Sequence, residues 1–229
     1  IRLKELQLGE SIYRDCADRI LEFGTNVAAL SVQCTTYPPA IQIARLLKRL
    51  KPEIRIVLGG HNASFVDVQT MERFRFIDAI VRGEGEVTFP ELIRGLEGEL
   101  DLERVEGITF RHGDRIVQNA DRALIEDLDS LPFSDYSFIP PPSVYRDACG
   151  IRRSIAILEV GRGCPHHCIY CSQSLVWRRR ARTFSIDRLI REMQNLRENF
   201  GAECFLLAYD QFTARRGFAE EFCHGVIDA

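Results

Sequence analysis

The sequence lacks an excess of charge of one sign, a long apolar run and a recognisable signal peptide. Lysine and arginine together number 30 against 33 acidic residues, so the composition does not favour nucleic acid as a partner. No apolar run approaches the length of about 18 residues that a membrane-spanning helix needs. Without a span or a signal peptide, we expect neither a membrane protein nor a secreted one.

A disulfide framework is also absent, although the chain holds 8 cysteines. Several of them fall in apolar or amphipathic segments, where a small buried thiol is ordinary: Cys16, Cys34, Cys204 and Cys223. Cys149 stands alone, and the other three are clustered. This usage predicts a reducing, cytoplasmic location.

The length of 229 residues, 45% of them hydrophobic, allows one large or two ordinary domains with real cores. The chain begins at Ile1 rather than at methionine and stops at Ala229 inside a helical pattern. We therefore expect it to be an excerpt of a longer protein, incomplete at both ends.

Apolar periodicity in the first half predicts strands that alternate with helices. Buried strands are expected at 27–32, 54–58 and 77–81, a further edge strand at 1–8, a hairpin at 107–117, and helices at 11–23, 38–50, 65–74 and 87–96. Such alternation indicates an α/β domain with a doubly wound parallel sheet.

Three loops leave the carboxyl ends of these strands: Thr35-Thr36, Gly59-Gly60 and Gly83-Glu84-Gly85. Ligands of open α/β sheets bind outside the carboxyl ends of the strands, so the loops predict a binding rim. Each loop taken singly is also compatible with a plain tight turn. No G-x-G-x-x-G follows any strand, so a dinucleotide ligand is not favoured.

The second half begins with an acidic and then aromatic and proline-rich stretch at 126–143, which we interpret as a linker. Beyond it, strands at 155–160 and 204–208 alternate with a helix at 185–200 and another from Arg215 onward. This order predicts the first part of a β/α barrel. Barrel active sites lie at the carboxyl ends of the strands, which here carry the cysteine cluster and residues 209–213.

The cluster consists of Cys164, Cys168 and Cys171, in C-x3-C-x2-C spacing. Three thiolates satisfy three irons of a four-iron cluster and leave the fourth open, whereas an electron-carrying cluster is normally held by four cysteines. His166 and His167 lie between the cysteines, so a zinc site is the alternative. It is disfavoured because no second Cys/His pair stands nearby.

An arginine-rich segment follows the cluster and ends at Arg182. It contains Arg178, Arg179, Arg180 and Arg182. A run of charge is most often a solvated face. The alternative is a local patch near an anionic group such as a carboxylate.

The cysteine spacing, with aromatic Tyr170 before the third cysteine, resembles the radical S-adenosylmethionine (SAM) family. The resemblance implies a 4Fe-4S cluster whose open iron chelates SAM, which the reduced cluster cleaves to an adenosyl radical. It also implies an external flavodoxin- or ferredoxin-like electron donor and a small-molecule or peptide substrate. Tyr209 and Asp210, which follow the second barrel strand, would help to hold SAM; a helix-capping role is the alternative for Asp210, with Thr213 as a competing cap.

The rim of the first domain is similar to cobalamin-binding domains. The residues that carry this likeness, and that the resemblance assigns to cobalamin, are Ser31, Gln33, Thr35, Thr36, Gly59, Gly60, Ser64, Gly83, Glu84 and Gly85. Gln33 departs from the usual leucine. The Asp-x-His-x-x-G element is absent, and its usual place is upstream of Ile1. His61 is interpreted as a loop residue rather than a cobalt ligand.

Together the resemblances imply a Rossmann-like cobalamin-binding domain at 1–120, a linker at 121–150 and the first part of a radical SAM barrel at 151–229. The implied function is methylation of an unactivated carbon. A radical SAM enzyme without functional cobalamin, which inserts sulfur or rearranges or closes a ring, stays open as an alternative. So does a non-catalytic cobalamin- or metal-binding protein.

Overall fold

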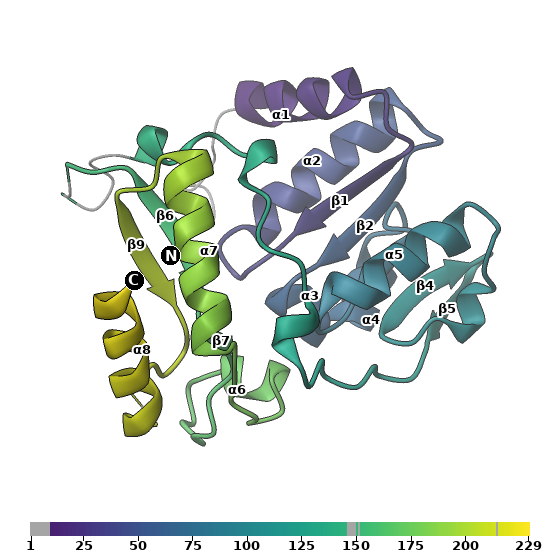
Figure 1. Ribbon diagram of the computed structural model, residues 1–229. Helices are drawn as coiled ribbons and strands as arrows, with labels where there is room; N and C mark the ends of the chain where they lie inside the picture. The colour runs from purple at the N-terminus through teal and green to yellow at the C-terminus, as the bar shows by residue number, and fades with distance from the viewer. Residues whose placement is uncertain (1–9, 146–149, 151, 214) are drawn as a thin grey trace. The chain divides into compact units, whose positions relative to one another are not determined.

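The computed structural model describes residues 10–145, 150, 152–213 and 215–229. This part of the chain divides after Leu124 into two compact units (Figure 1). The edge strand predicted at residues 1–8 and Cys149 lie outside the described residues.

The first unit is built on a five-stranded sheet with the order β1-β2-β3-β4-β5. Its strands are β1 (Val27–Ser31), β2 (Arg55–Gly59), β3 (Ala79–Val81), β4 (Ile108–His112) and β5 (Arg115–Gln118). The first three strands are parallel, and β4 and β5 form an antiparallel hairpin that pairs with β3. The predicted strands and hairpin are confirmed, but the sheet is mixed rather than parallel throughout.

The helices of this unit are α1 (Glu10–Glu22), α2 (Tyr37–Leu50), α3 (His61–Phe65), α4 (Asp67–Arg73) and α5 (Gly85–Leu96), with a short 3-10 turn, η2 (Leu102–Arg104). The single helix predicted at 65–74 is wrong. Val66 has φ −125° and ψ 29°, outside the helical region, so α3 ends there and α4 begins at the next residue.

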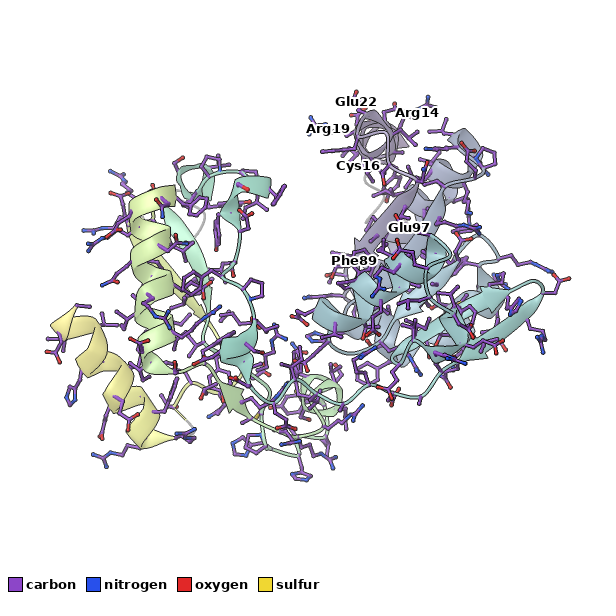
Figure 2. All side chains as sticks on the ribbon, turned by 45° about the vertical axis from the view of Figure 1, so that its right-hand side comes forward. Arg14, Cys16, Arg19, Glu22, Phe89 and Glu97 are labelled. Carbon is purple, nitrogen blue, oxygen red and sulfur yellow. The ribbon has the colours of Figure 1, made fainter. Side chains whose placement is uncertain are left out.

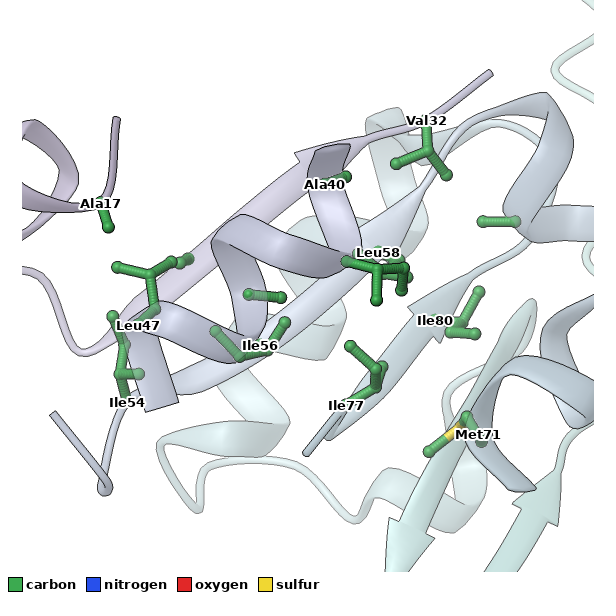
Figure 3. Packing of buried hydrophobic residues seen from close by; sticks show 14 residues of the cluster. Ala17, Val32, Ala40, Leu47, Ile54, Ile56, Leu58, Met71, Ile77 and Ile80 are labelled. Atoms are coloured by element: carbon green, nitrogen blue, oxygen red, sulfur yellow. The ribbon is translucent and has the colours of Figure 1, made fainter. Parts of the chain in front are cut away.

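Both faces of β2 are buried, as a doubly wound fold requires of an inner strand. Ile56 and Leu58 of β2 pack with Leu47 of α2 in one apolar cluster (Figure 3). Val57 lies between them in sequence and packs with Leu92 of α5 in a second cluster. Alternate residues of a strand point to opposite faces, so a continuous apolar run is what burial on both sides demands.

Helix α1 lies against α2 and contributes Ala17 to the first cluster. Its charged residues Arg14, Arg19 and Glu22 are exposed along the outer side (Figure 2). This division of apolar and charged residues is the pattern of a surface helix with one buried stripe.

The second unit contains β6 (Ile155–Glu159) and β9 (Cys204–Ala208), which pair in parallel, and the helices α7 (Ile186–Phe200) and α8 (Arg216–Asp228). The chain thus runs strand, helix, strand, helix, and the predicted opening of a β/α barrel is confirmed. Three elements were not expected: β7 (Gly161–Arg162) pairs antiparallel with β8 (Arg182–Thr183), and α6 (Gln173–Val176) lies between them in sequence.

Much of the predicted linker is packed on the second unit. It contains the 3-10 turns η3 (Leu128–Ser130), η4 (Tyr136–Phe138) and η5 (Pro142–Tyr145). Leu128 and Tyr136 are buried in the same cluster as Leu158 and Leu189. Tyr136 therefore serves packing, whereas Phe138 is 88% exposed.

Each described cysteine is a free thiol. Cys34 and Cys223 are exposed, so the burial expected for them is wrong, while Cys16 and Cys204 are partly buried. Within the described residues, no helix is both long and apolar enough to cross a membrane.

Candidate functional site

A pocket of about 570 Å³ opens at the carboxyl ends of β1, β2 and β3. Its walls include Ser31, Gly59, Gly60, Gly83 and Gly85, all of which the sequence had assigned to the rim. A side-chain Cβ added at Gly83 or Gly85 would meet no atom within 4 Å, so these glycines keep space open beside the pocket. The volume is in the range of pockets that take small molecules or part of a larger cofactor.

Ser64 joins two of the rim loops. Its hydroxyl donates to the carbonyl oxygen of Gly60 at 3.0 Å and accepts from the backbone N–H of Gly83 at 3.0 Å. The loop after β1 is joined to the loop after β2 through the backbone, since the Val32 N–H donates to the Gly59 carbonyl oxygen at 2.8 Å. The structure therefore brings together three segments that are separate in sequence.

Half of the predicted rim residues lie outside the pocket wall. Gln33 and Thr36 are hydrogen-bonded to each other: the backbone N–H of Gln33 donates to Thr36 Oγ1 at 2.9 Å. Thr35 is exposed, and Glu84 is buried at the amino end of α5. Ser64 itself holds the loops but does not line the pocket.

Sequence reasoning missed the apolar part of the wall, which is formed by Ala29, Leu30, Val57, Leu58, Val81, Phe89 and Pro90, with Glu86 beside them. The sequence of β1, Val-Ala-Ala-Leu-Ser, gave no clear signal of it, because the alternation lies in the burial of these residues. Ala29 and Ser31 are exposed, whereas Ala28 between Val27 and Ala29 is buried on the α2 side. One face of β1 is thus left uncovered beside the glycine loops.

A charge network around the buried pair of Arg82 and Asp67 fixes the carboxyl end of β3. The Arg82 guanidinium lies 3.7 Å from the carboxylate of Asp67 and 3.3 Å from that of Asp121. Asp67 also accepts from Gln118 Nε2 at 2.8 Å. Arg82 directly precedes Gly83, so this network holds the third rim loop in place.

In the second unit, the cysteine loop leaves β6 through two glycines that sit against another backbone segment. A Cβ at Gly163 would lie 2.0 Å from the carbonyl oxygen of Arg180, and one at Gly161 would lie 2.4 Å from that of Arg182. Gly163 also has φ +87°, which other residues rarely adopt. The start of the cysteine loop is therefore closed down on residues 180–182.

A stack of arginine and tryptophan lies behind this contact. The guanidinium carbons of Arg162 and Arg182 lie 5.9 and 5.6 Å from the ring centroid of Trp177. Arg162 Nε and Nη2 donate to the Glu159 carboxylate at 2.9 and 3.1 Å. Sequence reasoning missed this role, since arginine is usually exposed and only tertiary partners make its burial tolerable.

The predicted arginine patch is therefore divided. Arg182 is 7% exposed and donates to the carbonyl oxygen of Ile125. Arg180 is exposed and makes a two-pronged ion pair with Glu126 at 2.6 and 2.7 Å. Arg178 and Arg179 are exposed, so a single solvated face does not describe the run.

Cys168 is exposed, while Cys164 and Cys171 are partly buried. Across the described residues, no three Cys, His, Asp or Glu side chains are arranged as a metal site. Tyr170 is 87% exposed, and hydrogen bonding with Cys168 raises the pKa of its hydroxyl above the usual value. The loop thus presents three thiols and one phenol, all carried on eight consecutive residues.

Tyr209 connects the second strand to this loop. Burial raises its pKa, Arg215 lowers it, and Asp210 and Cys164 raise it further, so Tyr209 lies within electrostatic range of the first cysteine. Asp210 is exposed. The residue at the amino cap of α8 is Arg215, so the capping roles considered for Asp210 and Thr213 are wrong.

Comparison with known proteins agrees with both halves of this arrangement. A family model described as the B12 binding domain matches residues 6–93. A second model, the radical SAM superfamily, matches residues 158–225 and so includes all three clustered cysteines. The chain belongs to the radical SAM proteins that carry a B12-binding domain. The predicted family and fold class are confirmed.

Curated relatives of this radical SAM chain differ in the reactions that their names state. The chain is 28% identical over 204 residues to an uncharacterized methyltransferase, PH0819, of Pyrococcus horikoshii. This match covers 89% of the chain and 44% of that protein. The chain is 31% identical over 214 residues to an anaerobic magnesium-protoporphyrin IX monomethyl ester cyclase of Cereibacter sphaeroides, covering 92% and 34%. The chain thus spans less than half the length of these relatives.

Solved structures share the fold of this radical SAM chain. The methyltransferase TsrM from Kitasatospora setae, with tryptophan and a SAM analogue bound, superposes with a TM-score of 0.72 at 15% identity, covering 94% of the chain and 43% of TsrM. OxsB, with aqua-cobalamin and SAM bound, gives a TM-score of 0.68 at 21% identity, covering 95% and 31%. At these identities the likeness concerns the fold alone.

Proposed function

We propose that this chain is the cofactor-binding part of an enzyme that uses a 4Fe-4S cluster, SAM and cobalamin. The observation that carries the proposal is the pairing of two sites in one chain. Three free cysteines follow the carboxyl end of β6, and a glycine-walled pocket opens at the carboxyl ends of β1, β2 and β3. The two family matches fall on the same two regions.

Cys164, Cys168 and Cys171 would hold the cluster, because free thiols are the donors that iron–sulfur clusters select. When bound, these cofactors supply the cleavage of SAM to an adenosyl radical and the methyl group of methylcobalamin. The chain itself supplies a loop anchored through Gly163 on the Arg180 carbonyl. That anchoring leaves the thiols partly exposed and able to meet an inorganic core.

Tyr170, Tyr209 and Asp210 are the candidates for holding SAM beside the cluster. Asp210 is exposed at the carboxyl end of β9 and is free of a capping role, so its carboxylate can accept from the SAM ammonium group. Tyr209 keeps its proton at neutral pH, because burial raises its pKa. Its hydroxyl can therefore donate a hydrogen bond near Cys164.

The pocket of the first unit fits part of a cobalamin. Its wall combines apolar side chains with backbone at Gly59, Gly60, Gly83 and Gly85, which suits a flat, bulky ligand that must approach the main chain. Ser31 is the one hydroxyl in the wall. The chain would orient the cofactor, while the chemistry belongs to the cofactor.

The reaction that we propose is methylation of an unactivated carbon in a small-molecule or peptide substrate, with electrons from an external flavodoxin- or ferredoxin-like donor in the cytoplasm. Relatives named as methyltransferases support it. Ring closure on the same cofactors is the second candidate. The relatives named as cyclases, at 31% identity, favour it.

The test is anaerobic reconstitution of the full-length protein with iron, sulfide and cobalamin, followed by assay of 5′-deoxyadenosine after chemical reduction. Cys164→Ala should lose the visible absorption of the cluster and all SAM cleavage. Cys223→Ala is the matched control, since Cys223 is an exposed thiol on α8 and not one of the three clustered cysteines. Retention of a four-iron cluster and of SAM cleavage by Cys164→Ala would refute the assignment.

The same preparation separates the alternatives. A protein that cleaves SAM but shows no cobalamin absorption after reconstitution would be a radical SAM enzyme without functional cobalamin. Zinc in place of iron, or a reduced cluster that leaves SAM intact, would indicate a non-catalytic metal- or cobalamin-binding protein.

A further inference from the structure

The segment around the cysteine loop has an unusual charge. Residues 160–186 contain no aspartate or glutamate, although the chain as a whole has a formal net charge of −3. The same segment holds Arg162, Arg178, Arg179, Arg180 and Arg182, and the exposed His166 and His167. The second unit therefore concentrates positive charge next to the proposed cluster.

The buried arginines account for part of this charge, and Arg178, Arg179 and Arg180 carry the rest at the surface. Arg162 is paired with Glu159, and Arg182 is packed on Trp177. Arg180 is paired with Glu126. Arg178 and Arg179 form the exposed tip of a turn, residues 177–180, which we call the arginine turn.

The backbone of the arginine turn holds these two residues in a costly conformation. Arg178 has φ 50° and Arg179 has φ 57°, the left-handed region that costs a residue other than glycine about 1–2 kcal/mol. Hydrogen bonds maintain it: the Arg179 N–H donates to the Ser174 carbonyl at 2.6 Å, and the Arg180 N–H to the Trp177 carbonyl at 2.9 Å. Such strain is found where a function needs fixed geometry.

The arginine turn is also in direct contact with the cysteine loop. The Arg180 carbonyl oxygen occupies the space that a side chain at Gly163 would need, and Cys164 is the next residue. A protein that docks on the arginine turn would therefore be placed beside the three thiols. The charge, the fixed backbone and this contact all point to the same surface.

We propose that the arginine turn is the docking surface for a small acidic electron-carrier protein that reduces the cluster. This inference rests on the proposed function. One electron passes from the reduced flavin or iron–sulfur centre of the carrier, which is oxidised, to the cluster, which is reduced, and no bond of this chain forms or breaks. Complementary charge steers such encounters and raises their rate more than their affinity.

The decisive experiment compares two reductants on the reconstituted full-length protein. The variant is Arg178→Glu/Arg179→Glu, and the readout is the initial rate of 5′-deoxyadenosine formation. With reduced flavodoxin at low salt, we expect the rate to fall about tenfold or more. With dithionite, a small reductant that needs no docking, we expect the rate to stay within about twofold of wild type. The flavodoxin difference should shrink as salt is raised.

Two control variants isolate charge and position. Arg178→Lys/Arg179→Lys keeps the charge and should keep the flavodoxin-driven rate. Arg152→Glu/Arg153→Glu reverses another exposed adjacent pair, which precedes the amino end of β6 and so lies at the other end of the strand from the loop. This second control should leave both rates unchanged.

Several outcomes would overturn the inference. One is a flavodoxin-driven rate that the double glutamate variant leaves intact; another is an equal fall with both reductants, which would assign the arginines to the cofactor site itself. An intact flavodoxin rate with loss of binding to a single-stranded oligonucleotide would instead identify a nucleic-acid surface. If wild type fails to cleave SAM even with dithionite, the proposed function is wrong and this inference falls with it.

Discussion

The hydroxyl of Tyr136 bonds to both backbone groups of Ile157. It accepts from the Ile157 N–H at 2.8 Å and donates to the Ile157 carbonyl at 2.8 Å. Ile157 is the central residue of β6, whose other edge pairs with β9. One tyrosine from the segment before the strand thus satisfies the polar groups that the central residue of β6 directs to its open edge.

Tyr136→Phe should destabilise the second unit by about 1–3 kcal/mol, because it leaves a backbone donor and acceptor of β6 without their partner. Urea unfolding measures the loss, and faster amide exchange in residues 155–159 locates it. Tyr145→Phe is the matched control on an exposed tyrosine, where we expect a change below about 0.5 kcal/mol. Unchanged exchange at β6 in Tyr136→Phe would contradict the proposed edge role.

Tyr136 should also make the stability of the second unit depend on pH in the alkaline range. Burial raises the pKa of Tyr136 above its ordinary value of 10.0. The unfolded state therefore releases this proton first, so the stabilisation is present below pH 10.0 and is lost as pH rises through the folded-state pKa. Tyr136→Phe should lose less stability than wild type in that range. Equal losses in the two proteins would show that other groups carry the effect.

Gly60→Ala should disrupt the rim of the first unit. Gly60 has φ +89°, and an added Cβ would lie 2.8 Å from the Val32 carbonyl oxygen and 3.0 Å from Ser31 Oγ. Gly24 has φ +67° but open space around it, so Gly24→Ala measures the backbone cost alone, about 1–2 kcal/mol. We expect Gly60→Ala to cost about 1–3 kcal/mol more by overpacking and to weaken cobalamin binding, followed by visible absorption. Equal effects of the two variants would argue against a tight rim.

Gly163→Ala should prevent the cysteine loop from closing on residues 180–182. The added Cβ would be 2.0 Å from a backbone oxygen, which no side-chain rotation can relieve. Iron incorporated on reconstitution should fall severalfold. Gly201→Ala is the control, because Gly201 has φ +69° with no atom within 4 Å of its added Cβ. Iron binding should survive that change even though the end of α7 is destabilised.

Arg188→Met should be strongly destabilising. Arg188 is buried 3.6 Å from the buried carboxylate of Glu192, and it donates to the carbonyl oxygens of Leu131 and Pro132 at 2.8 and 2.9 Å. Breaking such a pair costs about 3–5 kcal/mol, because one charge stays buried without its partner. Arg191→Met, on the exposed side of the same helix, should cost about 1 kcal/mol or less.

A double variant checks the cause of that loss. Arg188→Met/Glu192→Met removes both charges and should recover part of the stability in urea unfolding. If the double variant is no more stable than Arg188→Met, the lost contacts with Leu131 and Pro132, rather than the uncompensated charge, dominate.

Local sequence patterns predicted most helices and strands of this chain but not every place where one is interrupted. The apolar runs of β2 and β3 identify strands because burial on both faces requires uninterrupted apolar residues. The interruption at Val66 and the small ribbon of β7 and β8 had no such signal. Both depend on contacts made elsewhere: the ribbon exists because Gly161 lets the Arg182 backbone approach.

The sequence by itself determined the chemistry that the chain can offer, since the spacing of Cys164, Cys168 and Cys171 and the glycines at the strand ends are local properties. Tertiary structure alone decided which groups share a site. It selected five of the ten rim candidates for the pocket wall and uncovered the apolar wall beside them. It also buried Arg162 and Arg182 while leaving Arg178 and Arg179 exposed. The physical reason is that burial and contact depend on partners far along the chain, such as Glu159 and Trp177, whose positions only the fold sets.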